Sequence, residues 1–305
     1  MVLHGMQLPV QSQSTVYAET WEAGAGPEDL AAVAVAADRH GFAYVAVCDH
    51  VAIPRRLAGA MSTVWYDPVA TLAFLAGVTA RVRLLSHVAV VGLRHPLLTA
   101  KQYATLDHLS GGRVILGVGA GHVQEEFDAL GADFARRGAL LDETIDALRA
   151  ALGPEEFPEF TGGRFAFKDL GQRPRPAQPR VPLWVGGSSP AALRRAALRG
   201  DGWLPQGDPR HRMPGRIATV RRLREAAGID TPLVVGAITE PLYVGAAGWD
   251  VGRPTLRGAP DALADSLRAY AAMGVDQIQV RFRSRSRTEL IDQMAAFAAD
   301  VAPHL

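Results

Sequence analysis

The sequence predicts a (β/α)8 barrel of the TIM type, a single unit over residues 1–305, on three observations. Apolar, strand-like runs alternate with helical patterns along the chain, with about eight of each. The runs are nearly continuous, which is typical of parallel strands buried on both faces. The 305 residues fit one such barrel with insertions. The competing architecture is a doubly wound open sheet. No G-x-G-x-x-G follows the first run, which counts against its dinucleotide-binding form.

The predicted strands are the apolar runs themselves. A glycine or a polar residue follows most of them, as expected where a buried strand passes into a loop. They cover residues 3–8, 43–48, 82–91, 114–118, 183–185, 203–204, 233–244 and 275–282.

Helical segments with recognisable starts lie between the runs. Asp67-Pro68, Ser189-Pro190 and Ala259-Pro260 each place a proline near a first turn, and Asp67 and Ser189 can cap their helices. Apolar residues then recur at helical spacing on three segments. They are Leu141, Ile145, Leu148 and Leu152; Leu263, Leu267 and Tyr270; and Leu290, Met294 and Phe297.

Residues 153–181, before the fifth predicted strand, interrupt this alternation. The segment is rich in proline and glycine, and the stretch from Phe160 to Phe165 predicts a short hairpin around a glycine turn. Two interpretations stay open. The segment is either a surface insertion or a lid over the barrel mouth, since long loops in compact domains are often functional.

Composition restricts the classes of function. The 32 basic and 31 acidic residues nearly cancel, so nucleic acid and acidic membrane surfaces are poor partners. Cys48 is the one cysteine and cannot form an internal disulfide, and no apolar run approaches the ~18 residues of a membrane span. We therefore expect a cytoplasmic protein. The two lysines, Lys101 and Lys168, fall on a helix and a loop, which argues against imine-forming aldolases.

Histidines gather in or just after the second to fourth predicted strands, where a barrel binds its ligand. Asp49-His50 follows the second strand, His87 lies in the third, and His122 follows the fourth. A histidine can give or take a proton near neutrality, and an acidic neighbour such as Asp49 can orient it. The alternative is that Asp49 caps the next helix and His50 is a rim residue.

Two glycine-rich corners lie where a predicted strand turns into a helix. Gly119-Ala120-Gly121 follows the fourth strand, and Gly186-Gly187-Ser188 follows the fifth. Glycines there let backbone N–H groups approach a ligand, and the helix start that follows favours an anion. The second corner is therefore a plausible phosphate cradle, although glycines also make ordinary turns.

Other common catalytic patterns do not occur in the sequence. It contains no H-E-x-x-H, no paired cysteines and no G-x-S-x-G, so we predict neither a metal site nor a serine nucleophile. What remains is a phosphate-bearing cofactor or substrate beside histidine and aspartate.

Five stretches carry a family resemblance across nearly the whole chain. The most specific runs from Leu93 to Gly121; the others are residues 5–9, 41–50, 182–187 and 197–203. With these stretches the chain resembles the luciferase-like monooxygenase superfamily, specifically its branch that depends on the deazaflavin coenzyme F420. The resemblance implies a TIM-barrel oxidoreductase and a homodimer.

The resemblance also implies roles for individual residues. His50, accompanied by Asp49, is the candidate acid or base beside the deazaflavin ring, and His122 is the second candidate. A non-prolyl cis peptide is expected at His87–Val88, behind the ring. The backbone of Gly119, Ala120 and Gly121 approaches the cofactor, and Gly186, Gly187 and Ser188 receive its phosphate.

The chain departs from some relatives at two places. Relatives that oxidise sugar phosphates carry a glutamate where this chain has His122, which puts a sugar-phosphate substrate in doubt. Their tryptophan after the Asp-His pair has no obvious counterpart; Trp65 and Tyr66 are the nearest aromatics and either roof the pocket or serve the core or surface.

The resulting hypothesis is hydride transfer between C5 of F420 and a small organic substrate. The alternatives are an FMN-dependent monooxygenase, which uses reduced flavin and oxygen, and a flavin-binding protein without catalysis. Single-residue patterns do not identify the substrate, because specificity in this fold lies in variable loops.

Overall fold

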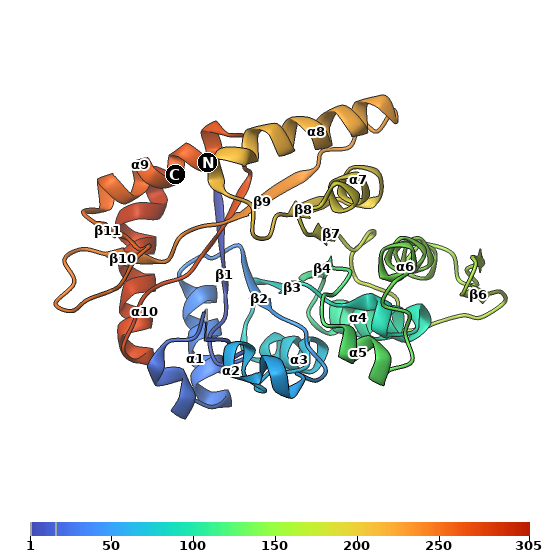
Figure 1. Cartoon of the computed structure of the whole chain (residues 1–305), viewed down its shortest axis with the longest axis horizontal. Coiled ribbons are helices and arrows are strands. Elements are labelled where there is room, and N and C mark those ends of the chain that lie inside the picture. Colours follow the sequence, from blue (N-terminus) through green and yellow to red (C-terminus); the bar gives the residue numbers. More distant parts are fainter. Residues whose placement is uncertain (1, 16) are drawn as a thin grey trace.

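The computed structural model describes residues 2–15 and 17–305, and its centre is a closed barrel of eight parallel strands (Figure 1). The order around the barrel is β1-β12-β9-β8-β7-β4-β3-β2, and the ladder from Leu3 opposite Gln277 to Met6 opposite Val280 closes the ring. The strands are β1 Leu3–Gln7, β2 Tyr44–Val47, β3 Arg83–Ser86, β4 Val114–Val118, β7 Leu183–Gly186, β8 Gly202–Leu204, β9 Val234–Ile238 and β12 Gln277–Val280. The barrel prediction is confirmed and the open sheet is excluded.

Helices connect successive strands and cover the outside of the barrel (Figure 1). The predicted caps are present: Asp67 accepts a hydrogen bond from the Ala70 N–H, and Ser189 accepts one from the Ala192 N–H. The α-helices are α1 Pro27–Arg39, α2 Ala58–Met61, α3 Pro68–Val78, α4 Pro96–Leu109, α5 Gln124–Ala129, α6 Arg137–Ala151, α7 Pro190–Arg199, α8 Met213–Ala226, α9 Pro260–Ala272 and α10 Arg287–Ala296. A π-helical turn, Phe297–Val301, extends α10. None of the helices in the described residues has the length and apolar character needed to cross a membrane.

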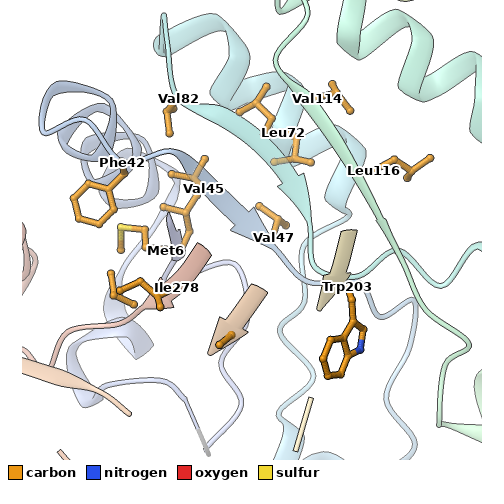
Figure 2. Close-up of a cluster of buried hydrophobic side chains, with 14 of the residues drawn as sticks. Met6, Phe42, Val45, Val47, Leu72, Val82, Val114, Leu116, Trp203 and Ile278 are labelled. Atoms are coloured by element: carbon orange, nitrogen blue, oxygen red, sulfur yellow. The ribbon is translucent and has the colours of Figure 1, made fainter. Parts of the chain in front are cut away.

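The core has two parts, as expected when strands are buried on both faces. Outward-facing strand residues such as Val45, Leu116 and Ile278 pack against the helices, together with Leu72 of α3 (Figure 2). A second cluster fills the barrel and consists of Tyr44, Ala46, Leu85, Ile115, Trp184 and Leu204.

Two glycines make room for the aromatic rings of this inner cluster. A Cβ on Gly5 would lie 2.5 Å from the Tyr44 ring, and one on Gly202 would lie 2.4 Å from the Trp184 ring. Contacts this short do not occur between real atoms, so the close-packed interior requires glycine at both positions.

Two of the apolar runs extend well beyond the barrel strands that they predicted. Within the run at residues 82–91 the strand ends at Ser86. Residues 87–90 follow, and the chain then forms a 3-10 turn, Val91–Leu93. The run at residues 233–244 divides into β9 and a separate strand, β10 (Leu242–Val244), which pairs with β11 (Leu256–Gly258) outside the barrel.

The insertion at residues 153–181 packs against the outside of α4 and α6. Its hairpin is confirmed: β5 (Phe160–Thr161) pairs with β6 (Ala166–Phe167), which Figure 1 shows at the edge of the molecule beyond α6. Glu143 of α6 accepts hydrogen bonds from the N–H groups of Arg164 and Phe165 at 2.7 and 2.8 Å. The whole segment is described, and none of it lines the cavity at the barrel mouth. The lid interpretation is therefore wrong, and the surface interpretation holds.

Candidate functional site

A cavity of about 470 Å³ opens at the carboxyl ends of the barrel strands. Its volume lies within the range of about 300–1,000 Å³ that is usual for ligand sites. Every predicted site residue except Ser188 lines it: Asp49, His50, His87, Val88, Gly119, Ala120, Gly121, His122, Gly186 and Gly187. The structure thus brings together residues that are up to 138 positions apart (49 to 187) in the sequence.

The floor of the cavity is formed around Val88, which follows the end of β3. The peptide bond between His87 and Val88 is cis, as the resemblance implied. The Val88 side chain reaches the two glycine corners, since a Cβ on Gly119 would lie 2.4 Å from Val88 Cγ2 and one on Gly186 would lie 2.8 Å from Val88 Cγ1. Both glycines are therefore needed to accommodate Val88. This requirement is separate from the predicted approach of their backbone to a ligand.

The His87 ring is buried, with 4% of the residue exposed. Burial lowers its pKa to about 4, so the ring is neutral at physiological pH. Within the described part of the chain neither ring nitrogen has a hydrogen-bond partner. His87 therefore contributes a neutral, buried wall to the cavity and not a titrating group.

The His50 imidazole is held by an acidic residue that the sequence analysis missed. His50 Nδ1 lies 2.8 Å from Oε2 of Glu126, a residue of α5, and the two side chains are only 8% and 3% exposed. Glu126 Oε1 accepts hydrogen bonds from the N–H groups of Val51 and Ala52 at 2.6 and 3.1 Å. Glu126 thus fixes both the ring and the chain that follows it.

Asp49 has a different partner from the one expected. Its carboxylate accepts two hydrogen bonds from Arg94, at 2.6 and 2.9 Å, and one from the N–H of Val90 at 2.8 Å. The Asp49 carboxylate is 1% exposed and the Arg94 side chain 19% exposed, so the acidic half of this ion pair is buried. The expectation that Asp49 orients His50 is wrong, and so is the helix-cap alternative. Asp49 instead joins the end of β2 to the segment after β3.

His122 and Trp65 complete the surroundings of His50 at the cavity mouth. The His122 ring centre lies 5.3 Å from that of His50, and the Trp65 ring approaches His50 edge-on at 4.5 Å. Burial and the nearby charge of His50 lower the pKa of His122. Trp65 lines the cavity, whereas Tyr66 packs against the core, so only the first of the two aromatics borders the site.

The second glycine corner leads into α7. Gly187 has φ 108°, a conformation that favours glycine, and Ser189 caps the helix. Ser188 does not line the cavity, and its hydroxyl accepts a hydrogen bond from the Gln206 N–H at 3.0 Å. Its contact with a phosphate stays a prediction. Ser189 and Arg195, the latter paired with Asp142, border the cavity next to it.

The fold and this cavity define a TIM barrel with a ligand-sized cavity at the strand ends. The family model of the luciferase-like monooxygenases matches residues 4–247. The chain therefore belongs to the luciferase-like monooxygenase family.

Individual relatives agree with this assignment. An uncharacterized protein of Mycobacterium tuberculosis is 40% identical over 167 residues, which are 55% of this chain and 57% of that protein. An F420-dependent glucose-6-phosphate dehydrogenase of Amycolatopsis mediterranei is 34% identical over 183 residues, 59% of this chain and 53% of that enzyme. The chain thus spans little more than half the length of these two relatives.

Two solved structures share the fold over 99% of this chain. The monooxygenase RslO1 of Streptomyces bottropensis, matched over 99% of its own chain, has a TM-score of 0.83 at 23% identity. An F420-dependent secondary alcohol dehydrogenase in complex with an F420-acetone adduct, matched over 98% of its chain, has a TM-score of 0.80 at 17% identity.

Proposed function

We propose that the protein transfers a hydride between coenzyme F420 and a small organic substrate, with His50 as the proton carrier. The observation that carries the proposal is the position of His50 in the wall of the cavity, fixed through Nδ1 by Glu126. Similarity to an F420-dependent dehydrogenase supports the choice of cofactor.

The residues around the cavity fit a flat, phosphate-bearing cofactor. Val88 offers an apolar surface on the floor, and Gly119 and Gly186, which lie against it, have no side chains of their own. The N-terminus of α7 faces the cavity through Ser189 and Ala192, and a helix N-terminus favours an anionic group such as a phosphate. When bound, the deazaflavin supplies two-electron hydride chemistry.

The protein's own groups would orient the reactants and manage the proton. His50 exchanges a proton with the substrate, and His122 at the mouth is the second candidate for that role. Trp65 and Met61 line the cavity and reduce the access of water. The ion pair of Asp49 and Arg94 joins the end of β2 to the segment after β3.

Single-turnover mixing of the protein, F420 and a panel of small alcohols, aldehydes and ketones tests the proposal. We expect the deazaflavin absorbance to change at a rate that depends on substrate. The main rival, an FMN-dependent monooxygenase, has a fold neighbour in RslO1 and would instead consume oxygen with reduced FMN. Binding without any turnover would favour a non-catalytic flavin-binding protein. The homodimer and the cytoplasmic location stay predictions.

A further inference from the structure

Glu126 makes three hydrogen bonds that all converge on the segment after β2. One oxygen binds the backbone of Val51 and Ala52, and the other binds Nδ1 of His50. Glu126 is itself 4% exposed. A buried carboxylate whose hydrogen bonds all go to one neighbouring segment fixes that segment rather than its own helix.

The chemistry of the carboxylate decides which nitrogen of His50 carries the proton. Although burial raises the pKa of Glu126, the hydrogen bond and the charge of His50, together with the two backbone N–H groups, outweigh that effect, so the pKa lies below its usual value. An ionised carboxylate can only accept hydrogen bonds. In neutral His50 the proton must therefore be on Nδ1, which leaves Nε2 as the acceptor.

The other groups around His50 leave Nε2 free for a ligand. His122 and Trp65 approach the ring at 5.3 and 4.5 Å without a hydrogen bond, and Asp49 is turned toward Arg94. Nε2 has no hydrogen-bond partner among residues 2–15 and 17–305, and His50 lines the cavity.

We infer that Glu126 is the positioning residue of His50: its carboxylate holds the proton on Nδ1 and presents Nε2 to the substrate as the proton-exchanging atom. The inference rests on the proposed function. In the oxidative direction the substrate loses a hydride to oxidised F420 and a proton to Nε2, and the resulting imidazolium returns that proton to solvent. The reverse direction takes the proton from the imidazolium.

The Glu126→Gln variant tests the position of the proton without any cofactor. If the amide oxygen keeps the backbone bonds of Val51 and Ala52, its NH2 group faces Nδ1 and can only donate. The proton of neutral His50 must then move to Nε2. Nitrogen NMR of histidine-labelled apo protein, with the His50 signal assigned from a His50→Gln spectrum, distinguishes the two tautomers. We expect Nδ1–H in the natural protein and Nε2–H in the variant.

Single-turnover hydride transfer provides the second measurement. We expect Glu126→Gln to slow it by roughly 10²–10⁴-fold, with F420 affinity within about twofold, because Nε2 no longer accepts the proton. Glu126→Asp retains an acceptor and should restore part of the rate. Glu125→Gln is the matched control, since Glu125 pairs with Arg56 at the surface, and it should change neither measurement.

Two results would overturn the inference: a natural protein whose neutral His50 carries the proton on Nε2, or a folded Glu126→Gln variant with unchanged tautomer and rate. The spectrum of the natural protein alone shows which nitrogen of neutral His50 carries the proton, so the inference can be tested even if the variant does not fold. A protein that binds no F420 but shows the expected tautomers would overturn the proposed function and support the role of Glu126.

Discussion

The side chain of Val88 occupies the place that a Cβ on Gly119 would need, because Cγ2 of Val88 would lie 2.4 Å from that Cβ. We therefore expect Gly119→Ala to lower the free energy of unfolding by about 1–3 kcal/mol, a usual penalty for overpacking. Adding Val88→Ala should remove most of this penalty. Urea unfolding of both single variants and the double variant measures it. Equal penalties with valine and with alanine at position 88 would show that the contact is not the cause.

The ion pair between Asp49 and Arg94 has a structural role. Replacing Asp49 by Asn leaves Arg94 without its buried partner, and we expect a loss of about 3 kcal/mol in unfolding free energy. The double variant Asp49→Asn/Arg94→Gln should recover part of that loss. Chemical denaturation compares the three proteins. If Asp49→Asn kept full stability but lost hydride transfer, Asp49 would have the catalytic role that we assign to His50.

His50 and His122 should differ in their kinetic importance. We expect His50→Ala to slow single-turnover hydride transfer by roughly 10²–10⁴-fold, the usual contribution of a positioned acid or base. Among residues 2–15 and 17–305 the rim residue His122 has no such hydrogen-bonded partner, and His122→Ala should cost less than about tenfold. Stopped-flow measurements at saturating cofactor compare the two variants. An unchanged rate in His50→Ala would remove that residue as the proton carrier.

The buried ring of His87 should make the fold sensitive to acid. Burial lowers its pKa from 6.5 to about 4. Below pH 6.5 the unfolded chain therefore binds a proton that the folded protein does not bind. The contribution of His87 to the free energy of unfolding is fully present above pH 6.5. It decreases by up to about 3 kcal/mol as the pH falls toward 4. His87→Leu should show a smaller decrease over that range. A His87 NMR signal that titrates near pH 6.5 would contradict this account.

The barrel itself could be predicted because its strands are buried on both faces and read as continuous apolar runs. The boundaries that failed have local causes. The apolar run continues past the end of β3 because its later residues border the cavity or the core. These residues are Val88, Val90 and Val91. Residues 239–241 separate β9 from β10, although apolar residues flank them on both sides.

The predicted cavity residues could be found because each lies in or directly after an apolar run, whereas their partners could not. His50 and Glu126 are 76 positions apart, and no spacing rule connects them. The adjacent Asp49 seemed the natural partner, but consecutive side chains near a strand end point in opposite directions. The one available signal was an acidic residue, Glu126, next to the apolar Phe127 on a short helix that directly follows a glycine corner.

Parallel titration of the purified protein with F420 and with FMN tests the central claim most directly. Calorimetry gives both dissociation constants under the same conditions. The account predicts that F420 binds at least about tenfold more tightly, a difference of about 1.4 kcal/mol, and that a Gly187→Val variant weakens this binding. Tighter binding of FMN, accompanied by oxygen consumption when the flavin is reduced, would contradict it.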